Sequence, residues 1–303
     1  MSCKIIVDSF NDPTYLHGSV ICYIPKTIKI REVRCILKGK EYTSFQQGEY
    51  AFYGKNIFLL REVVLYNRDT IEAGTYRFPF EFRLPPDLPN SLQMKHGCIK
   101  YTLKAYVDIP LSFDYIEKIG VLFSHPVDLN VQHGILLGNI TYEWEEKMNW
   151  ISCFACCDNG LSTMRCTLQE KNAYVSGEVL NMFVDVKNIS KTNMQRLDVT
   201  LTRITTFKVH GGNCVTQKRF LAFQTYDGVS SNTQRSYSID YRIPQSIVPN
   251  NFFWCKLIEE VFRLRVVGVY PSCYDDLIVD FYLVIGQIPL NNLAEDEETT
   301  RTN

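Results

Sequence analysis

The sequence predicts an all-β protein made of two tandem β-sandwich domains. Apolar and polar residues alternate with a period of two along many short segments, turn-forming residues separate those segments, and one set of motifs occurs twice at a nearly constant spacing. Such alternation places one face of a strand on a core and the other in water. No segment keeps a 3.6-residue apolar period over about ten residues, which argues against a helical fold.

The alternation defines the predicted strands one by one. Between residues 99 and 107, Ile99, Tyr101 and Leu103 face one way, whereas Lys100 and Lys104 face the other. The same pattern occurs at residues 180–186, 197–201 and 262–266. Turn residues punctuate the strands, at Asn11-Asp12-Pro13, Gly211-Gly212 and Asp227-Gly228. Short strands with turns at these intervals are typical of β-sandwiches.

The repeated motifs predict the domain organisation. Two motifs recur at one and the same offset: Tyr15-x-x-Gly18-x-Val20 as Tyr174-x-x-Gly177-x-Val179, and Phe82-Arg83-Leu84-Pro85 as Tyr241-Arg242-Ile243-Pro244. A later strand-like pair, 101–104 and 262–265, has a slightly larger offset, as a short insertion would cause. Solenoid repeats are roughly 20–50 residues long, so this much longer repeat indicates two similar globular domains. We predict a first sandwich over residues 1–145, a Cys-rich linker over 146–160, a second sandwich over 161–290 and an acidic polar tail over 291–303.

Composition narrows the function classes. Over 303 residues the chain is 46% apolar and 21% charged, which is ordinary for a soluble globular protein. A net charge of −1 gives no general attraction to nucleic acid. The first ten residues do not resemble a signal peptide, and no window approaches the ~18 apolar residues of a membrane span. Eleven cysteines, mostly isolated, favour reduced thiols and a cytoplasmic location.

Several motifs together resemble those of the arrestin-domain-containing proteins, the α-arrestins. The segment from His96 to Ala105, preceded by Phe82-x-Leu84-Pro85, resembles the hallmark of their N-terminal domain. Other matching segments are Val127-Asp128-Leu129-Asn130, Gly160-Leu161-Ser162, Lys171-x-x-Tyr174-x-x-Gly177-Glu178, Cys255-x-x-Ile258 and 284–290. The resemblance covers roughly residues 4–290.

This resemblance implies a fold and a function. The expected fold is two immunoglobulin-like β-sandwiches, the arrestin fold, without a catalytic site or cofactor. The expected function is that of a cytosolic adaptor, which binds cytosolic regions of membrane receptors or transporters. It directs their transport, endocytosis or endosomal sorting, in some members coupled to ubiquitination. We therefore expect a cytoplasmic protein with transient endosome or plasma-membrane association, peripheral membrane contact included.

One departure from the family concerns ubiquitin ligases. Many α-arrestins dock the WW domains of these ligases through Pro-Pro-x-Tyr motifs in a C-terminal tail. The only Pro-Pro here is Pro85-Pro86, which is followed by Asp87-Leu88 and lies within the N-domain hallmark. A ubiquitin ligase therefore remains a candidate partner, but the sequence has no Pro-Pro-x-Tyr motif to dock it.

A basic stretch is the candidate partner-binding site. In β-arrestins, basic N-domain residues hold receptor phosphates, and clustered cations bind phosphate well. Alternation places Lys29 and Arg31 opposite to Arg34 and Lys38, so a solvated strand face is the plainer interpretation. The six candidate residues are Lys26, Lys29, Arg31, Arg34, Lys38 and Lys40.

Cysteines of the linker region suggest an alternative function. Cys153 and Cys156 have zinc-ligand spacing, with Cys157 and Cys166 as further thiols, although a second Cys-x-x-Cys is missing. Acylation at a membrane surface is another interpretation, and free thiols are the plain one. The rival hypotheses are thus a zinc- or redox-responsive structural protein and a soluble scaffold without membrane cargo.

The sequence gives no support for an enzyme. Its five histidines are scattered, and it contains no His-Glu-x-x-His, phosphate-binding Gly-x-x-x-x-Gly-Lys or Gly-x-Ser-x-Gly motif. Three consecutive aromatic residues, Phe252-Phe253-Trp254, are interpreted as part of the second domain's core.

Overall fold

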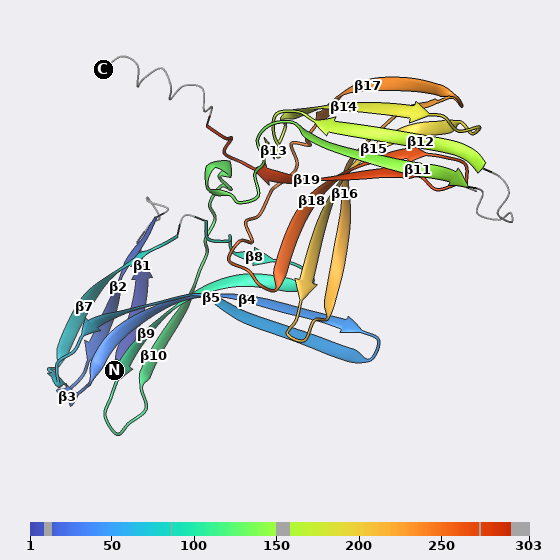
Figure 1. Ribbon diagram of the computed structural model, residues 1–303. Coiled ribbons are helices and arrows are strands. Elements are labelled where there is room, and N and C mark those ends of the chain that lie inside the picture. The colour runs from blue at the N-terminus through green and yellow to red at the C-terminus, as the bar shows by residue number, and fades with distance from the viewer. Residues whose placement is uncertain (9–13, 86, 150–157, 273, 292–303) are drawn as a thin grey trace, which may run out of the picture. The chain divides into compact units, whose positions relative to one another are not determined.

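The structure is a computed structural model that describes residues 1–8, 14–85, 87–149, 158–272 and 274–291 (Figure 1). It confirms the all-β prediction, since the one helical element among these residues is a 3-10 turn, η1 (Leu129–Val131). No helix in the described ranges is long and apolar enough to cross a membrane. The chain divides into unit 1 (Met1–His125, Thr206–Val215 and Asn251–Glu259) and unit 2 (Pro126–Thr205, Thr216–Asn250 and Glu260–Asn303).

Unit 1 contains two antiparallel sheets that share one core. The first has the order β1-β2-β7, with β1 (Ser2–Val7), β2 (Tyr15–Ile24) and β7 (Gly74–Arg83). The second has the order β10-β9-β4-β5, with β10 (Tyr115–Val121), β9 (Gly97–Asp108), β4 (Glu32–Gln47), β5 (Tyr50–Tyr66) and β8 (Leu92–Gln93) beside β9. A small sheet joins β3 (Ile28–Lys29) to β6 (Thr70–Ile71). As predicted, Ile99, Tyr101 and Leu103 point into the core.

Unit 2 is built around a second pair of sheets. One has the order β11-β12-β14-β17, with β11 (Ile140–Asn149), β12 (Asp158–Leu168), β14 (Val179–Asn188) and β17 (Thr233–Arg242). The other has the order β13-β19-β18-β15-β16, with β13 (Ala173–Val175), β19 (Leu277–Gly286), β18 (Ile258–Val269), β15 (Met194–Lys208) and β16 (Cys214–Val229). Its core includes Val184, Leu201 and Leu264, each fully buried.

At the second motif of the sequence repeat, the two units have equivalent strands. At the first motif they do not. Strands β7 and β17 end at Arg83 and Arg242, and the two strands begin as well as end at equivalent positions of the repeat. However, Tyr15 pairs with Arg83, whereas Arg242 pairs with Val179, which lies beyond Tyr174. The cause is an extra strand, because Tyr174 lies in β13 and Gly177, with a φ of 92°, turns the chain into β14.

Two sequence interpretations need correction. Residues 126–145, assigned above to the first domain, belong to unit 2, and residues 140–145 lie in β11, which pairs with β12. Within β11, Tyr142 and Trp144 alternate with glutamates, as residues of an edge strand do. Of the predicted linker over 146–160, residues 146–149 continue β11 and residues 158–160 begin β12, whereas residues 150–157 lie outside the described residues.

The second correction concerns the aromatic triplet. Phe252 and Trp254 pack against the core of unit 1, not that of the second domain, and Trp254 Nε1 donates to Asp87 Oδ1 at 2.8 Å. Asn251 Nδ2 also donates to the Asp87 carbonyl, at 2.6 Å. Segment 251–259 therefore completes unit 1, although it lies in the second half of the chain.

A buried carboxylate holds this segment in place. Glu41 on β4 is 0% exposed, and its oxygens accept the backbone N–H groups of Lys256, Leu257 and Ile258 at 2.6, 3.1 and 3.2 Å. Asn56 Nδ2 donates to the same carboxylate at 2.8 Å. Four donors satisfy the charge, as burial of a carboxylate requires.

Removing this carboxylate should open the segment. In Glu41→Ala three backbone N–H groups lose their acceptor, and buried donors left unpaired cost about 1–3 kcal/mol each. We expect the amides of 256–258 to exchange with deuterium at least about 100-fold faster, since about 1.4 kcal/mol is a factor of ten. Glu49→Ala, at an exposed turn residue, is the control. Equal exchange in both variants would contradict this role of Glu41.

Candidate functional site

The outer face of the four-stranded sheet of unit 1 carries a group of lysines. Odd-numbered residues of β4 from Val33 to Thr43 are buried, so the even-numbered ones point away from the core. Strand register extends the same face across β9 and β10, because directly paired residues share a face. We call this surface the lysine face and define it by Lys38, Lys40, Lys100, Lys104 and Lys118.

Like charges oppose one another on the lysine face. Lys40 pairs directly with Lys100, and Lys104 pairs directly with Lys118. Lysines in such positions repel, which destabilises a sheet. Lys104 Nζ contacts Tyr106 weakly, at 3.5 Å from its hydroxyl and 5.9 Å from its ring centroid. Within the described ranges none of the five lysines has a carboxylate partner, so an anionic ligand would relieve the repulsion.

Apolar side chains lie among the lysines. Leu60 is directly opposite Lys38 and Ile57 opposite Lys40, and these side chains are 52% and 44% exposed. Ile116 on β10 is also exposed on this side, opposite Tyr106. The face therefore offers cations and apolar contacts together, which suits a peptide or a membrane surface better than a small inorganic ion.

A hollow of about 600 Å³ continues the lysine face past Lys40 and Lys100. At the next outward position, Tyr42 pairs with Cys98 on one side and Lys55 on the other. The residues that line this hollow are Tyr42, Thr43, Ser44, Tyr53, Gly54, Lys55, Gln93, Met94, Lys95, Gly97, Cys98 and His210. Two further lysines and two tyrosines thus extend the surface available to a bound chain.

The structure separates the six basic residues that the sequence singled out. Arg31 bonds to Asp108 at 2.7 Å, and Arg34 lies 3.0 Å from Glu62 and 3.4 Å from Glu32. Lys29 is exposed on β3 in the small sheet, and Lys26 is exposed in the turn before it. Only Lys38 and Lys40 join the lysine face with their charge uncompensated by an ion pair within the described residues.

Three members of the lysine face were missed by sequence reasoning. The alternation of residues 99–107 already placed Lys100 and Lys104 on the outward side of a strand. What it could not show is which strand lies beside it, because register between β4 and β9 joins positions that are far apart in the sequence. A search for outward lysines on all predicted strands would have identified the candidates without grouping them.

Of the four cysteines in the zinc hypothesis, the structure describes Cys166. Cys166 lies on β12, buried in the core of unit 2, and this burial raises the pKa of its thiol. Its environment is that of a packed apolar residue. A buried neutral thiol of this kind is a poor metal ligand. Cys153, Cys156 and Cys157 lie outside the described residues.

Two units, each built from a pair of β-sheets, define a class of tandem β-sandwich proteins. Comparison with known families agrees. The family described as arrestin (or S-antigen), N-terminal domain, matches residues 7–130, and the corresponding C-terminal domain matches residues 159–290. The chain belongs to the arrestin family, and its relatives place it with the α-arrestins. The predicted family and fold class are thus confirmed.

Individual relatives are distant. Arrestin domain-containing protein 1 of mouse is 23% identical over 284 residues, covering 91% of this chain and 61% of that protein. Thioredoxin-interacting protein of human is 23% identical over 295 residues, covering 91% of this chain and 73% of that protein. The chain therefore spans about three fifths of the mouse relative.

Charge reversal on the lysine face should stabilise the protein. Lys40→Glu replaces a repulsive pair with Lys100 by an attractive one, which is worth about 0.5 kcal/mol. We expect the midpoint of thermal unfolding to rise by about 1–2 °C. Lys29→Glu, on an exposed strand without an opposed lysine, should leave the midpoint unchanged. A lower midpoint for Lys40→Glu would show that Lys40 supports the fold.

Burial of Cys166 predicts a protected thiol. Because its thiol is desolvated, we expect iodoacetamide near pH 8, roughly the unperturbed pKa of a thiol, to leave Cys166 unmodified in the folded protein. Cys214 is exposed and should react under the same conditions. Peptide mapping before and after denaturation measures both. Rapid modification of folded Cys166 would restore it as a candidate metal ligand.

Proposed function

We propose that this protein is a non-enzymatic adaptor that binds phosphorylated or acidic cytosolic segments of membrane receptors or transporters through its lysine face. Membership of the arrestin family supports the adaptor role. The observation that carries the ligand class is the presence of two directly opposed lysine pairs, Lys40 with Lys100 and Lys104 with Lys118. Uncompensated cations arranged in this way bind phosphate oxygens through charge-assisted hydrogen bonds.

The spacing of the lysine pairs suggests the form of the ligand. Lys100 and Lys104 are four residues apart on β9, which corresponds to about 13 Å at a rise of about 3.3 Å per residue. An extended peptide has nearly the same rise, so phosphates four residues apart would reach both pairs at once. Lys38 lies between them, opposite Thr102. Leu60 and Ile57 supply apolar contacts for residues between or beside the phosphates.

The proposed role extends to the cell. Binding of such segments would direct cargo transport, endocytosis or endosomal sorting from the cytoplasm, with transient visits to endosomes or the plasma membrane. Coupling to ubiquitination is part of the same proposal, and no ligase-docking segment is assigned to it. The exposed aliphatic residues of the lysine face also favour peripheral contact with an anionic membrane while cargo is held.

Peptide binding tests the proposal. Fluorescence anisotropy would compare a labelled extended peptide bearing phosphoserines four residues apart with peptides bearing adjacent phosphoserines or none. We expect the first to bind most tightly, and Lys38→Glu/Lys40→Glu to weaken it at least about tenfold, because two attractive contacts become repulsive. Affinity should also fall as salt is added.

The matched control is Lys26→Glu/Lys29→Glu, which makes the same charge change on exposed residues away from the lysine face. It should leave binding nearly unchanged. Equal losses of affinity in both variants would show that binding depends on net charge and not on the lysine face. No loss in either variant would overturn the assignment of this face. Vesicles containing anionic lipid, used as a second probe, show whether the face binds membrane in place of phosphopeptide.

A further inference from the structure

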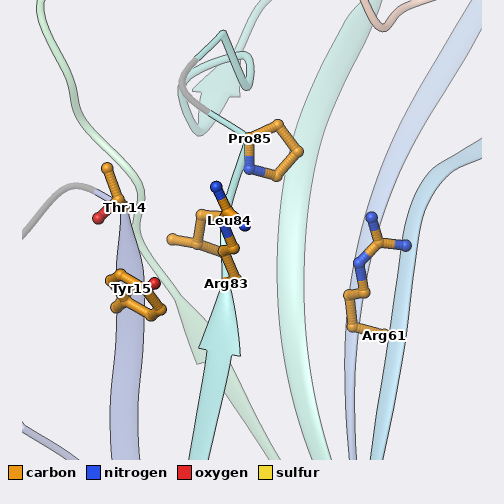
Figure 2. A pocket seen from close by; sticks show the side chains of 6 residues that line it. All are labelled: Thr14, Tyr15, Arg61, Arg83, Leu84 and Pro85. Carbon is orange, nitrogen blue, oxygen red and sulfur yellow. The ribbon is translucent and has the colours of Figure 1, made fainter.

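A second hollow lies where the edges of the two sheets of unit 1 diverge. Strand β5 forms the edge of one sheet and β7 the edge of the other. The edges are in contact at Tyr66 and Phe78, whose ring centroids are 5.8 Å apart. Further along each strand, Arg61 and Arg83 line a pocket of about 500 Å³ with Thr14, Tyr15, Leu84 and Pro85 (Figure 2).

The pocket combines two arginines with an apolar wall. Figure 2 shows Arg61 rising from β5 on one side, opposite Tyr15 and Leu84 on the other. Arg61 belongs to the inward-facing series of β5, between buried Leu59 and half-buried Val63. A charged residue at such a position faces the space between the sheets and not the lysine face, on which Leu60 lies.

Neither arginine is neutralised by its surroundings. Arg61 donates to the carbonyl of Leu60 at 3.3 Å, and across the part of the chain that the structure describes no carboxylate pairs with Arg61 or Arg83. The contrast with a nearby arginine is clear, because Arg34 on the adjacent strand has two glutamate partners. Two unpaired guanidinium groups at one pocket define a place for an anion.

The edge of β5 is suited to pairing with another strand. Register shifts leave Phe58 and Leu65 as extra residues in β5, and the residues between them, 59–64, form an uninterrupted ladder with β4. Every second residue of 59–64 directs its N–H and C=O away from β4, and Arg61 lies within this run. Strand β7 is less suited, because Pro79 removes one backbone donor.

We propose that this pocket docks an extended acidic peptide, which adds to the β5 edge at residues 59–64 and places a Glu or Asp carboxylate between Arg61 and Arg83. A carboxylate fits better than a phosphate here, since Tyr15, Leu84 and Pro85 form an apolar wall against which a dianion would be costly to desolvate. Main-chain pairing supplies affinity and the arginines supply specificity, as in other cases of strand addition. The site goes beyond the proposed function because it lies on the other side of the sheet from the lysine face.

A selection experiment tests the docking site without a known partner. The probe is a phage-displayed library of random peptides, selected in parallel on the full chain, on Arg61→Gln/Arg83→Gln and on Lys38→Glu/Lys40→Glu. We expect the full chain and the lysine-face variant to enrich one set of peptides, with Asp or Glu among β-forming residues. The arginine variant should not enrich this set. Failure to select such a set from the full chain would overturn the proposal.

Synthesis of the leading peptide sharpens the result. Its affinity, measured by fluorescence anisotropy, should fall at least tenfold for Arg61→Gln/Arg83→Gln and remain unchanged for Arg68→Gln, an exposed arginine outside the pocket. Replacing the central Glu by Gln in the peptide should produce a similar loss, and bound peptide should protect amides of 59–64 from exchange. Tighter binding of a phosphoserine version would overturn the carboxylate assignment, and equal binding by the arginine variant would overturn the site.

Thermal unfolding of Arg61→Gln/Arg83→Gln shows whether a loss of peptide binding is caused by unfolding of the variant. Its unfolding midpoint should match that of the unmodified protein because both arginines are exposed. Binding of the phosphopeptide to the lysine face should also survive in this variant. If the unmodified protein fails to bind the phosphopeptide yet binds the pocket peptide, the proposed function is wrong and the pocket stands. The reverse result would remove the pocket and leave the proposed function intact.

Discussion

The buried carboxylate of Glu41 is the contact on which unit 1 depends. It gathers three consecutive backbone N–H groups, those of Lys256 to Ile258, at the start of β18, and thereby fixes a segment that is distant from it in sequence. The neighbouring core position is then filled by Ile258, which is fully buried in unit 1. Without an acceptor for those donors, burying this backbone would be unfavourable. The first unit is therefore completed by residues from the second half of the chain.

This dependence explains which parts of the fold the sequence could predict. Alternation and turn residues are local, and so the strands and the repeat at Pro85 and Pro244 could be recognised directly. The positions of Phe252 and Trp254 could not, because both of their possible cores demand apolar residues and local sequence does not choose between them. The first repeated motif predicted equivalent strands that the structure does not have. A Tyr-x-x-Gly motif can lie within one strand, as in β2, or between two strands, as between β13 and β14, and local sequence does not distinguish these cases.

The lysine face shows the same limit for the candidate site. Sequence clustering drew attention to six basic residues, yet Arg31 and Arg34 have acidic partners from β9 and β5 in the fold. The residues that join Lys38 and Lys40 come from β9 and β10, which only strand pairing reveals. Charge in a sequence is thus a weak guide to charge on a surface, because ion pairs cancel some residues and register concentrates others.

A net charge of −1 is compatible with two separate cationic places because their location is set by the pleat of the strands and not by composition. On β5, Leu60 points to the lysine face and the adjacent Arg61 to the opposite side, so one strand contributes to both. Repulsion between paired lysines lowers stability, and unpaired arginines in a pocket add nothing to it. Both features are understandable if anionic chains bind there, since a ligand then supplies the negative charge that the fold itself places elsewhere.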